Sequence, residues 1–178
     1  MKFGDNKKLY IRRALFIFLV CLTAAFQHTD IVVPDFFGAK AMLLIPLCVC
    51  IAIYERSLGG LAFGVLCGVL WDCVSVTADG FFSVALAATG FLAGAAITYL
   101  MRNNVFSALI LSAVFSFGTN IAYWLIFILL KGYEGAWSVL ISFYLPGALY
   151  TVLFTFIYYY LVGFIVRVTP VNRSIKSV

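Results

Sequence analysis

The sequence predicts an all-α integral membrane protein in which six membrane-spanning helices form one bundle. Hydrophobic residues make up 65% of the chain and charged residues only 11%, whereas about 25% of the residues of a soluble domain are charged. The charged residues also lie in short segments between long apolar runs, which is typical of helices that cross a bilayer. We therefore expect a single membrane domain over residues 1–178, with the lipid bilayer as its surroundings.

The first two spans are expected over residues 10–27 and 39–54. The first follows a basic N-terminal segment, and Phe26 with the two residues after it makes a poor signal-peptidase site, so we expect this helix to be retained. Pro46 lies inside the second span. Because proline removes a backbone donor, we expect it to kink that helix.

Small residues mark one face of the third span, which is expected over residues 57–74 after a polar turn. Gly60, Gly64 and Gly68 recur every fourth residue, and the same step reaches Asp72. Residues four apart lie on one face of an α-helix. In a bilayer such a stripe lets another helix approach closely, so it predicts a packing face that ends in one carboxylate.

The residues leave two roles open for Asp72. As a structural group, it can accept hydrogen bonds from backbone donors of the following turn or from the hydroxyl groups of Ser75, Thr77 or Ser83. As a functional group, it can contact a basic residue of a partner or a ligand, because ionisable side chains in membrane helices often mark functional contacts.

The fourth span is expected over residues 81–100, directly after the turn signal Asp79-Gly80. Gly90 and Gly94 belong to a second stripe of small residues along this span. The third and fourth spans are therefore the expected close pair, joined as a short hairpin.

The last apolar segments contain polar and helix-breaking residues. The fifth span is expected over residues 105–130 and carries serine, threonine and asparagine side chains that can bond between helices. The final apolar run is too long for one straight span and is interrupted at Pro146. We therefore expect an interfacial segment over residues 138–144 and a sixth span over residues 146–166.

The distribution of basic residues predicts the orientation of the bundle. Six spans place both termini on one side, and ten of the twelve lysine and arginine residues fall on that side. These ten are Lys2, Lys7, Lys8, Arg12, Arg13, Arg56, Arg102, Arg167, Arg173 and Lys176. Because cytoplasmic loops carry the excess of basic residues, both termini are expected in the cytoplasm.

The expected spans carry few groups that could perform catalysis. They hold no Ser/His/Asp set, no paired carboxylates, no histidine cluster and no phosphate-binding loop. The five cysteines are odd in number and show no Cys-x-x-Cys spacing. We therefore expect no enzymatic activity, no cofactor and no metal site. The net charge of +5 follows from the loops that set topology, so nucleic acid is not an expected partner.

The segment from Glu55 to Gly80 resembles the core of the MreD family, the rod-shape-determining membrane proteins of bacteria. The resemblance is carried by Glu55-Arg56-Ser57, the glycine stripe, Asp72 and Gly80. Three further segments agree with it, namely Pro34-Asp35, Arg102 and the run from Leu145 through Pro146 to Tyr150. One position departs from the pattern, because Thr151 stands where the family commonly has asparagine.

The resemblance implies a non-catalytic subunit of the cell-elongation complex in the bacterial cytoplasmic membrane. Such a subunit scaffolds MreC and the peptidoglycan synthases and thereby maintains cell shape. The implied direct partner is MreC, and the implied indirect partners are MreB, RodA and the elongation penicillin-binding protein. The candidate residues for helix packing or partner contact are Gly60, Gly64, Gly68, Asp72, Gly90, Gly94, Arg102 and Pro146.

A small-molecule binder is the alternative function. The expected fold also resembles the substrate-binding subunits of energy-coupling-factor vitamin transporters, which share a glycine-rich helix that ends in an acidic residue. A subunit of that kind should have a capped outer cavity lined by aromatic, amide and charged side chains. Trp71, Asp72, Asn120 and Trp124 are the candidates for such a lining.

Overall fold

In the computed structural model, residues 3–27, 42–75, 80–101, 103–130 and 136–170 are described, and every regular element within these ranges is helical. Five of the described helices are long and apolar enough to cross a membrane. The all-helical prediction is therefore confirmed, and the length and composition of these helices indicate a multi-pass membrane protein.

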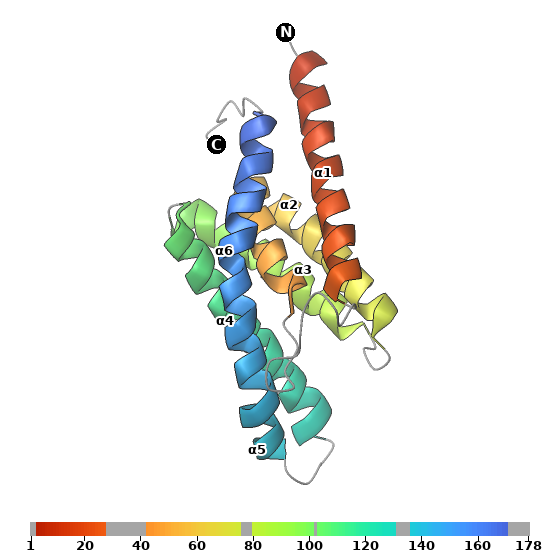
Figure 1. The fold of residues 1–178 in the computed structure, drawn as a ribbon, viewed down its shortest axis with the longest axis vertical. Coiled ribbons are helices and arrows are strands. Elements are labelled where there is room, and N and C mark those ends of the chain that lie inside the picture. Colours follow the sequence, from red (N-terminus) through yellow and green to blue (C-terminus); the bar gives the residue numbers. More distant parts are fainter. Residues whose placement is uncertain (1–2, 28–41, 76–79, 102, 131–135, 171–178) are drawn as a thin grey trace.

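Of the helices at the outside of the bundle, α6 (Leu145–Val168) follows most of the long axis of the molecule, whereas α1 (Phe3–Gln27) lies along its upper half (Figure 1). The first turn of α1 and the last turn of α6 lie at the same end. α4 (Val105–Trp124) runs to the other end, where the short helix α5 (Ala136–Val139) precedes α6.

The α2 helix (Leu44–Val74) consists of two helical segments that meet at Arg56. Arg56 has φ 64° and ψ −173°, a backbone conformation that glycine adopts readily and other residues rarely do. The break lies at the polar turn predicted between the second and third spans. It separates a buried first segment from the glycine-striped second segment.

The prediction that Pro46 kinks a helix is wrong. α2 begins at Leu44, whereas the second span was expected to begin near residue 39, and Met42 and Leu43 precede the helix. Pro46 therefore lies in the first helical turn, where a backbone N–H has no acceptor within the helix. The missing donor costs no helical hydrogen bond there, and the bend occurs at Arg56 instead.

The two ends of the α4–α6 connection contain π-helical turns. α4 continues into a π-helix at Leu125–Leu129, and a second π-helix at Leu140–Tyr144 joins α5 to α6. The expected interfacial segment over residues 138–144 is therefore helical and continuous with the last span. Pro146 lies in the first turn of α6, where proline is tolerated.

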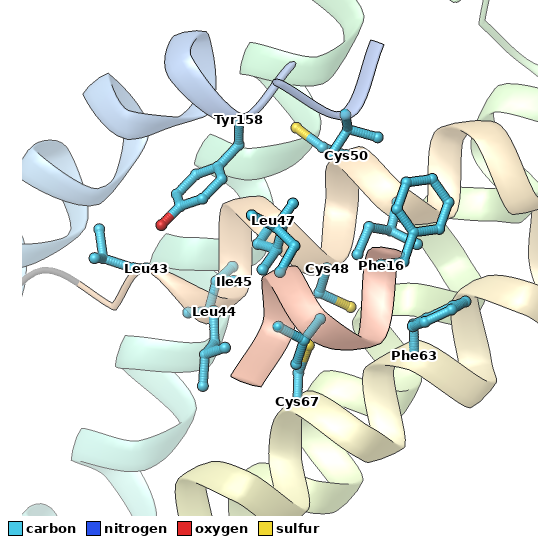
Figure 2. Close-up of a cluster of buried hydrophobic side chains, with 14 of the residues drawn as sticks. Phe16, Leu43, Leu44, Ile45, Leu47, Cys48, Cys50, Phe63, Cys67 and Tyr158 are labelled. Atoms are coloured by element: carbon cyan, nitrogen blue, oxygen red, sulfur yellow. The ribbon is translucent and has the colours of Figure 1, made fainter. Parts of the chain in front are cut away.

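The core of the bundle is built around the first segment of α2, from Leu44 to Ile53, whose side chains are buried on all sides. Figure 2 shows Leu44, Ile45, Leu47 and Cys48 of this segment among side chains from other parts of the chain. These neighbours include Phe16 of α1, Phe63 and Cys67 of the second α2 segment, and Tyr158 of α6. A helix that is apolar all round belongs at the centre of a bundle, which is its place here.

Candidate functional site

The glycine stripe of α2 lies directly against the backbone of α3 (Phe81–Tyr99). A Cβ atom on Gly60 would collide with the carbonyl oxygen of Gly90, and one on Gly90 would collide with that of Gly60. A Cβ on Gly64 would collide with the carbonyl oxygen of Leu86. The two helices therefore meet backbone to backbone, as close packing of small residues in a bilayer requires.

The contact continues at both ends of the stripe. At one end, a Cβ on Gly68 would meet the backbone of Ser83. At the other end, a Cβ on Gly94 would lie 2.6 Å from the carbonyl carbon of Arg56 and 2.7 Å from the backbone nitrogen of Ser57. α3 therefore follows the second segment of α2 from the hairpin turn up to the break.

The carboxylate of Asp72 closes the hairpin. One of its oxygens accepts a hydrogen bond from the backbone N–H of Ser83 at 2.8 Å and another from the Ser83 hydroxyl at 2.5 Å. The N-cap residue of α3 is Gly80, with φ 79°, which has no side chain to accept such a bond. Asp72 thus supplies from α2 the acceptor that a local N-cap normally supplies, at the end of the helix dipole that favours negative charge.

A buried ion pair joins α1 to the break in α2. A guanidinium nitrogen of Arg12 lies 2.5 Å from a carboxylate oxygen of Glu55, and the two side chains are 4% and 1% exposed. Glu55 immediately precedes Arg56. The pair therefore fixes the first helix against the point at which the chain changes direction.

This ion pair was not predicted from the sequence, because Arg12 and Arg13 were considered only as basic residues of the cytoplasmic side. A signal was present in the periodicity of α1. A set of residues that recur every three or four positions is buried, whereas Arg13 is exposed. The buried set is Arg12, Phe16, Val20, Thr23 and Gln27. That spacing places Arg12 on the packed face of the helix.

Two helices hold the beginning of α2. The Gln27 side-chain oxygen at the end of α1 accepts a hydrogen bond from the Leu44 backbone N–H at 3.2 Å. The Thr151 hydroxyl of α6 accepts one from the Met42 backbone N–H at 2.9 Å. Thr151 occupies the position that departs from the MreD pattern. It is fully buried, and its hydroxyl also donates a hydrogen bond to the backbone carbonyl of Gly147 at 2.7 Å.

Aromatic side chains connect the closed end of the hairpin to α4. Trp71 packs on Phe82 with ring centroids 5.1 Å apart, and Phe82 stacks on Tyr123 at 5.3 Å. Tyr123 in turn stacks on Phe127 of the first π-helix at 4.7 Å. This row of rings holds α4 against the same end of α3 that Asp72 caps.

The four candidates for a ligand cavity are all engaged in helix contacts. Asp72 accepts the bonds from Ser83, and Trp71 packs on Phe82. Asn120 donates a hydrogen bond to a backbone carbonyl one turn earlier on α4 at 2.8 Å. Trp124 is 4% exposed and packs on Trp137, with ring centroids 5.2 Å apart.

Several predicted features lie outside the described residues. They are Arg102, the Pro34-Asp35 segment and Asp79 of the predicted turn. Pro146 is described, and it lies half-buried in the first turn of α6.

The fold and these contacts define an all-helical, multi-pass membrane protein organised around a closely packed glycine hairpin. Comparison of the chain with protein-family models, curated proteins and solved structures finds no match.

Proposed function

We propose that this chain is an MreD-like, non-catalytic subunit of the bacterial cell-elongation complex. The proposal rests on where the residues of the MreD-like pattern lie in the fold. Gly60, Gly64 and Gly68 form the closest helix contact of the hairpin, and Asp72 closes it at the turn that contains Gly80. The residues of this pattern form the helix contacts of the membrane domain. Scaffold subunits that share this fold would therefore also share the pattern.

The proposal includes six membrane crossings. In it, the break at Arg56 divides α2 into two crossings, and the second segment, at 1.5 Å per residue, is about 27 Å long. The first segment, from Leu44 to Glu55, is about 18 Å long, and the proposal counts it as a separate crossing. Support comes from the start of α1 and the end of α6 at one end of the molecule, because an even number of crossings returns the chain to its starting side (Figure 1).

In this proposal both termini are cytoplasmic. The ten-to-two distribution of basic residues supports that orientation. The start of α1 and the end of α6 then face the cytoplasm, and the turn between α2 and α3 faces the outside.

A scaffolding role is supported by three charged groups that are engaged in contacts between helices. The carboxylate of Asp72 bonds to Ser83, and Arg12 pairs with Glu55, so these groups hold helices together. The proposed partner MreC binds on an apolar helix face of this bundle and brings the subunit to MreB, RodA and the elongation penicillin-binding protein.

Affinity purification of the tagged chain from cells in a mild detergent, followed by mass spectrometry, tests the proposal. We expect MreC to be enriched over an equally expressed, unrelated multi-pass protein, together with the elongation penicillin-binding protein. Enrichment of an ATPase module instead would contradict the proposal and support a vitamin-transporter subunit.

A further inference from the structure

A groove of about 520 Å³ runs along the C-terminal half of α6, next to the end of the first α2 segment. Its volume lies within the ~300–1,000 Å³ of small-molecule sites. From Ile157 to Arg167 it follows about 15 Å of helix, which is half the ~30 Å thickness of the hydrocarbon core. The groove therefore extends through about one leaflet.

The charged group of the groove lies at one end. Arg167, in the last turn of α6, is its charged lining residue, and the rest of its wall is apolar or aromatic. The Tyr54 hydroxyl lies 3.2 Å from where a Cβ of Gly163 would be, one helical turn below Arg167. The absence of a side chain at Gly163 leaves room for this hydroxyl at the groove wall.

We propose that this groove binds one anionic phospholipid, with an acyl chain along α6 and the phosphate at Arg167. The groove is long and largely apolar, has the depth of one leaflet and ends at a single cation. These features match the shape and charge of such a lipid. Basic pockets between membrane helices bind anionic headgroups in this way, and each basic residue near the surface contributes about 1 kcal/mol. The hydroxyl of Tyr54 lies beside Gly163, whose backbone is one helical turn, about 6 Å, from that of Arg167, and in the proposal the lipid's glycerol esters lie at this level.

Native mass spectrometry of the purified full-length chain tests the proposal, with phosphatidylglycerol and phosphatidylcholine of the same acyl chains as probes. We expect the chain to retain phosphatidylglycerol about fivefold more tightly, the factor that corresponds to ~1 kcal/mol. Glycerol 3-phosphate at the same concentration should not displace it, because the acyl chain is part of the recognition. Equal retention of both lipids would overturn the proposal.

Two variants with matched controls locate the site. Arg167→Gln should abolish the preference for phosphatidylglycerol, whereas Arg13→Gln, which removes the cation of a smaller groove between α1 and α2, should preserve it. Gly163→Leu should fill the groove and lower retention of both lipids. Gly118→Leu, on an open part of α4, should not.

The same variants distinguish a lipid site from diffuse charge attraction and from a groove that binds protein. If Arg167→Gln and Arg13→Gln reduce the preference equally, the attraction is a diffuse effect of surface charge and the groove is not a site. If Gly163→Leu leaves lipid retention unchanged but removes a co-purifying protein, the groove binds a partner helix, and the lipid proposal is wrong. Because the lipid measurements use the isolated chain, they are independent of the proposed role in cell elongation.

Discussion

At the scale of single residues, Asp72 acts as the cap of a helix to which it does not belong. It accepts two hydrogen bonds from Ser83, in the first turn of α3, which begins after a glycine. Of the two roles that the sequence leaves open, the structure therefore favours the structural one. Ser83 was among the donors expected from the sequence. Its choice over Ser75 depends on the geometry of the hairpin, which local spacing does not determine.

Asp72→Asn should retain most of this cap, because the amide oxygen still accepts a hydrogen bond. We expect it to cost up to about 1 kcal/mol, whereas Asp72→Leu should cost about 2–3 kcal/mol because it leaves the donors of Ser83 unsatisfied. Thermal unfolding in detergent and the yield of monodisperse protein measure both. An Asn variant that is as unstable as the Leu variant would show that the charge itself is required.

The contribution of the ion pair between Arg12 and Glu55 to the free energy of unfolding can be measured with a double-variant cycle. Either Arg12→Met or Glu55→Leu alone leaves one buried charge without its partner, at a cost of about 3–5 kcal/mol. The double variant should recover at least about 1 kcal/mol of the summed loss. Thermal unfolding of the four proteins gives this coupling energy.

The neighbouring Arg13 is a matched control, because it is exposed. Arg13→Met should change stability by less than about 0.5 kcal/mol. If the losses from Arg12→Met and Glu55→Leu simply add, the two side chains are not coupled and the assignment of the pair is wrong.

Arg12 and Glu55 are 43 positions apart, so only the folded bundle pairs them. The local sequence predicts that both are exposed, because Arg12 follows a basic tail and Glu55 lies in a polar turn, and such segments are normally solvated. The periodicity of α1 would have placed Arg12 on the packed face, but its acidic partner on α2 could not be inferred from either segment alone.

At the scale of elements, the hairpin of α2 and α3 was predictable because its signal is local. Glycine every fourth residue on one helix and small residues on the next give a backbone contact without any information on distant parts of the chain. The position of the bend in α2 was harder to predict from the sequence. Proline is the usual cause of a kink, but Pro46 lies in a first turn, and the chain bends at Arg56 in a conformation that arginine rarely adopts.

Alanine substitutions of two glycines should therefore have effects of opposite sign. A Cβ at Gly64 collides with a backbone oxygen of α3 that no rotamer change can move, so Gly64→Ala should destabilise by about 1–3 kcal/mol. Gly118 faces open space on α4, and Gly118→Ala should stabilise by about 0.5–1 kcal/mol through helix propensity. Unfolding midpoints compare the two variants. If both variants have the stability of the parent, the stripe of α2 does not contact α3.

At the scale of the whole molecule, the composition was sufficient to predict a multi-pass helical protein, because 65% hydrophobic residues cannot be covered by so little polar surface. The number of crossings depends on α2. If its 31 residues cross once, the described helices make five crossings, and if its two segments each cross, they make six. The break at Arg56 and the common end of α1 and α6 favour six (Figure 1).

Cysteine accessibility in intact cells tests most directly whether the chain is a six-crossing subunit with both ends in the cytoplasm. Single cysteines replace Lys131 and Arg102 in a background where the exposed native Cys21 and Cys73 are serine. A membrane-impermeant maleimide is then applied, with permeabilised cells as the control for reactivity. We predict labelling at position 131 from outside and at position 102 only after permeabilisation. The reverse result would mean either that the six-crossing bundle is inverted or that α2 crosses once, and either outcome would contradict the proposed topology and the proposed MreD-like function.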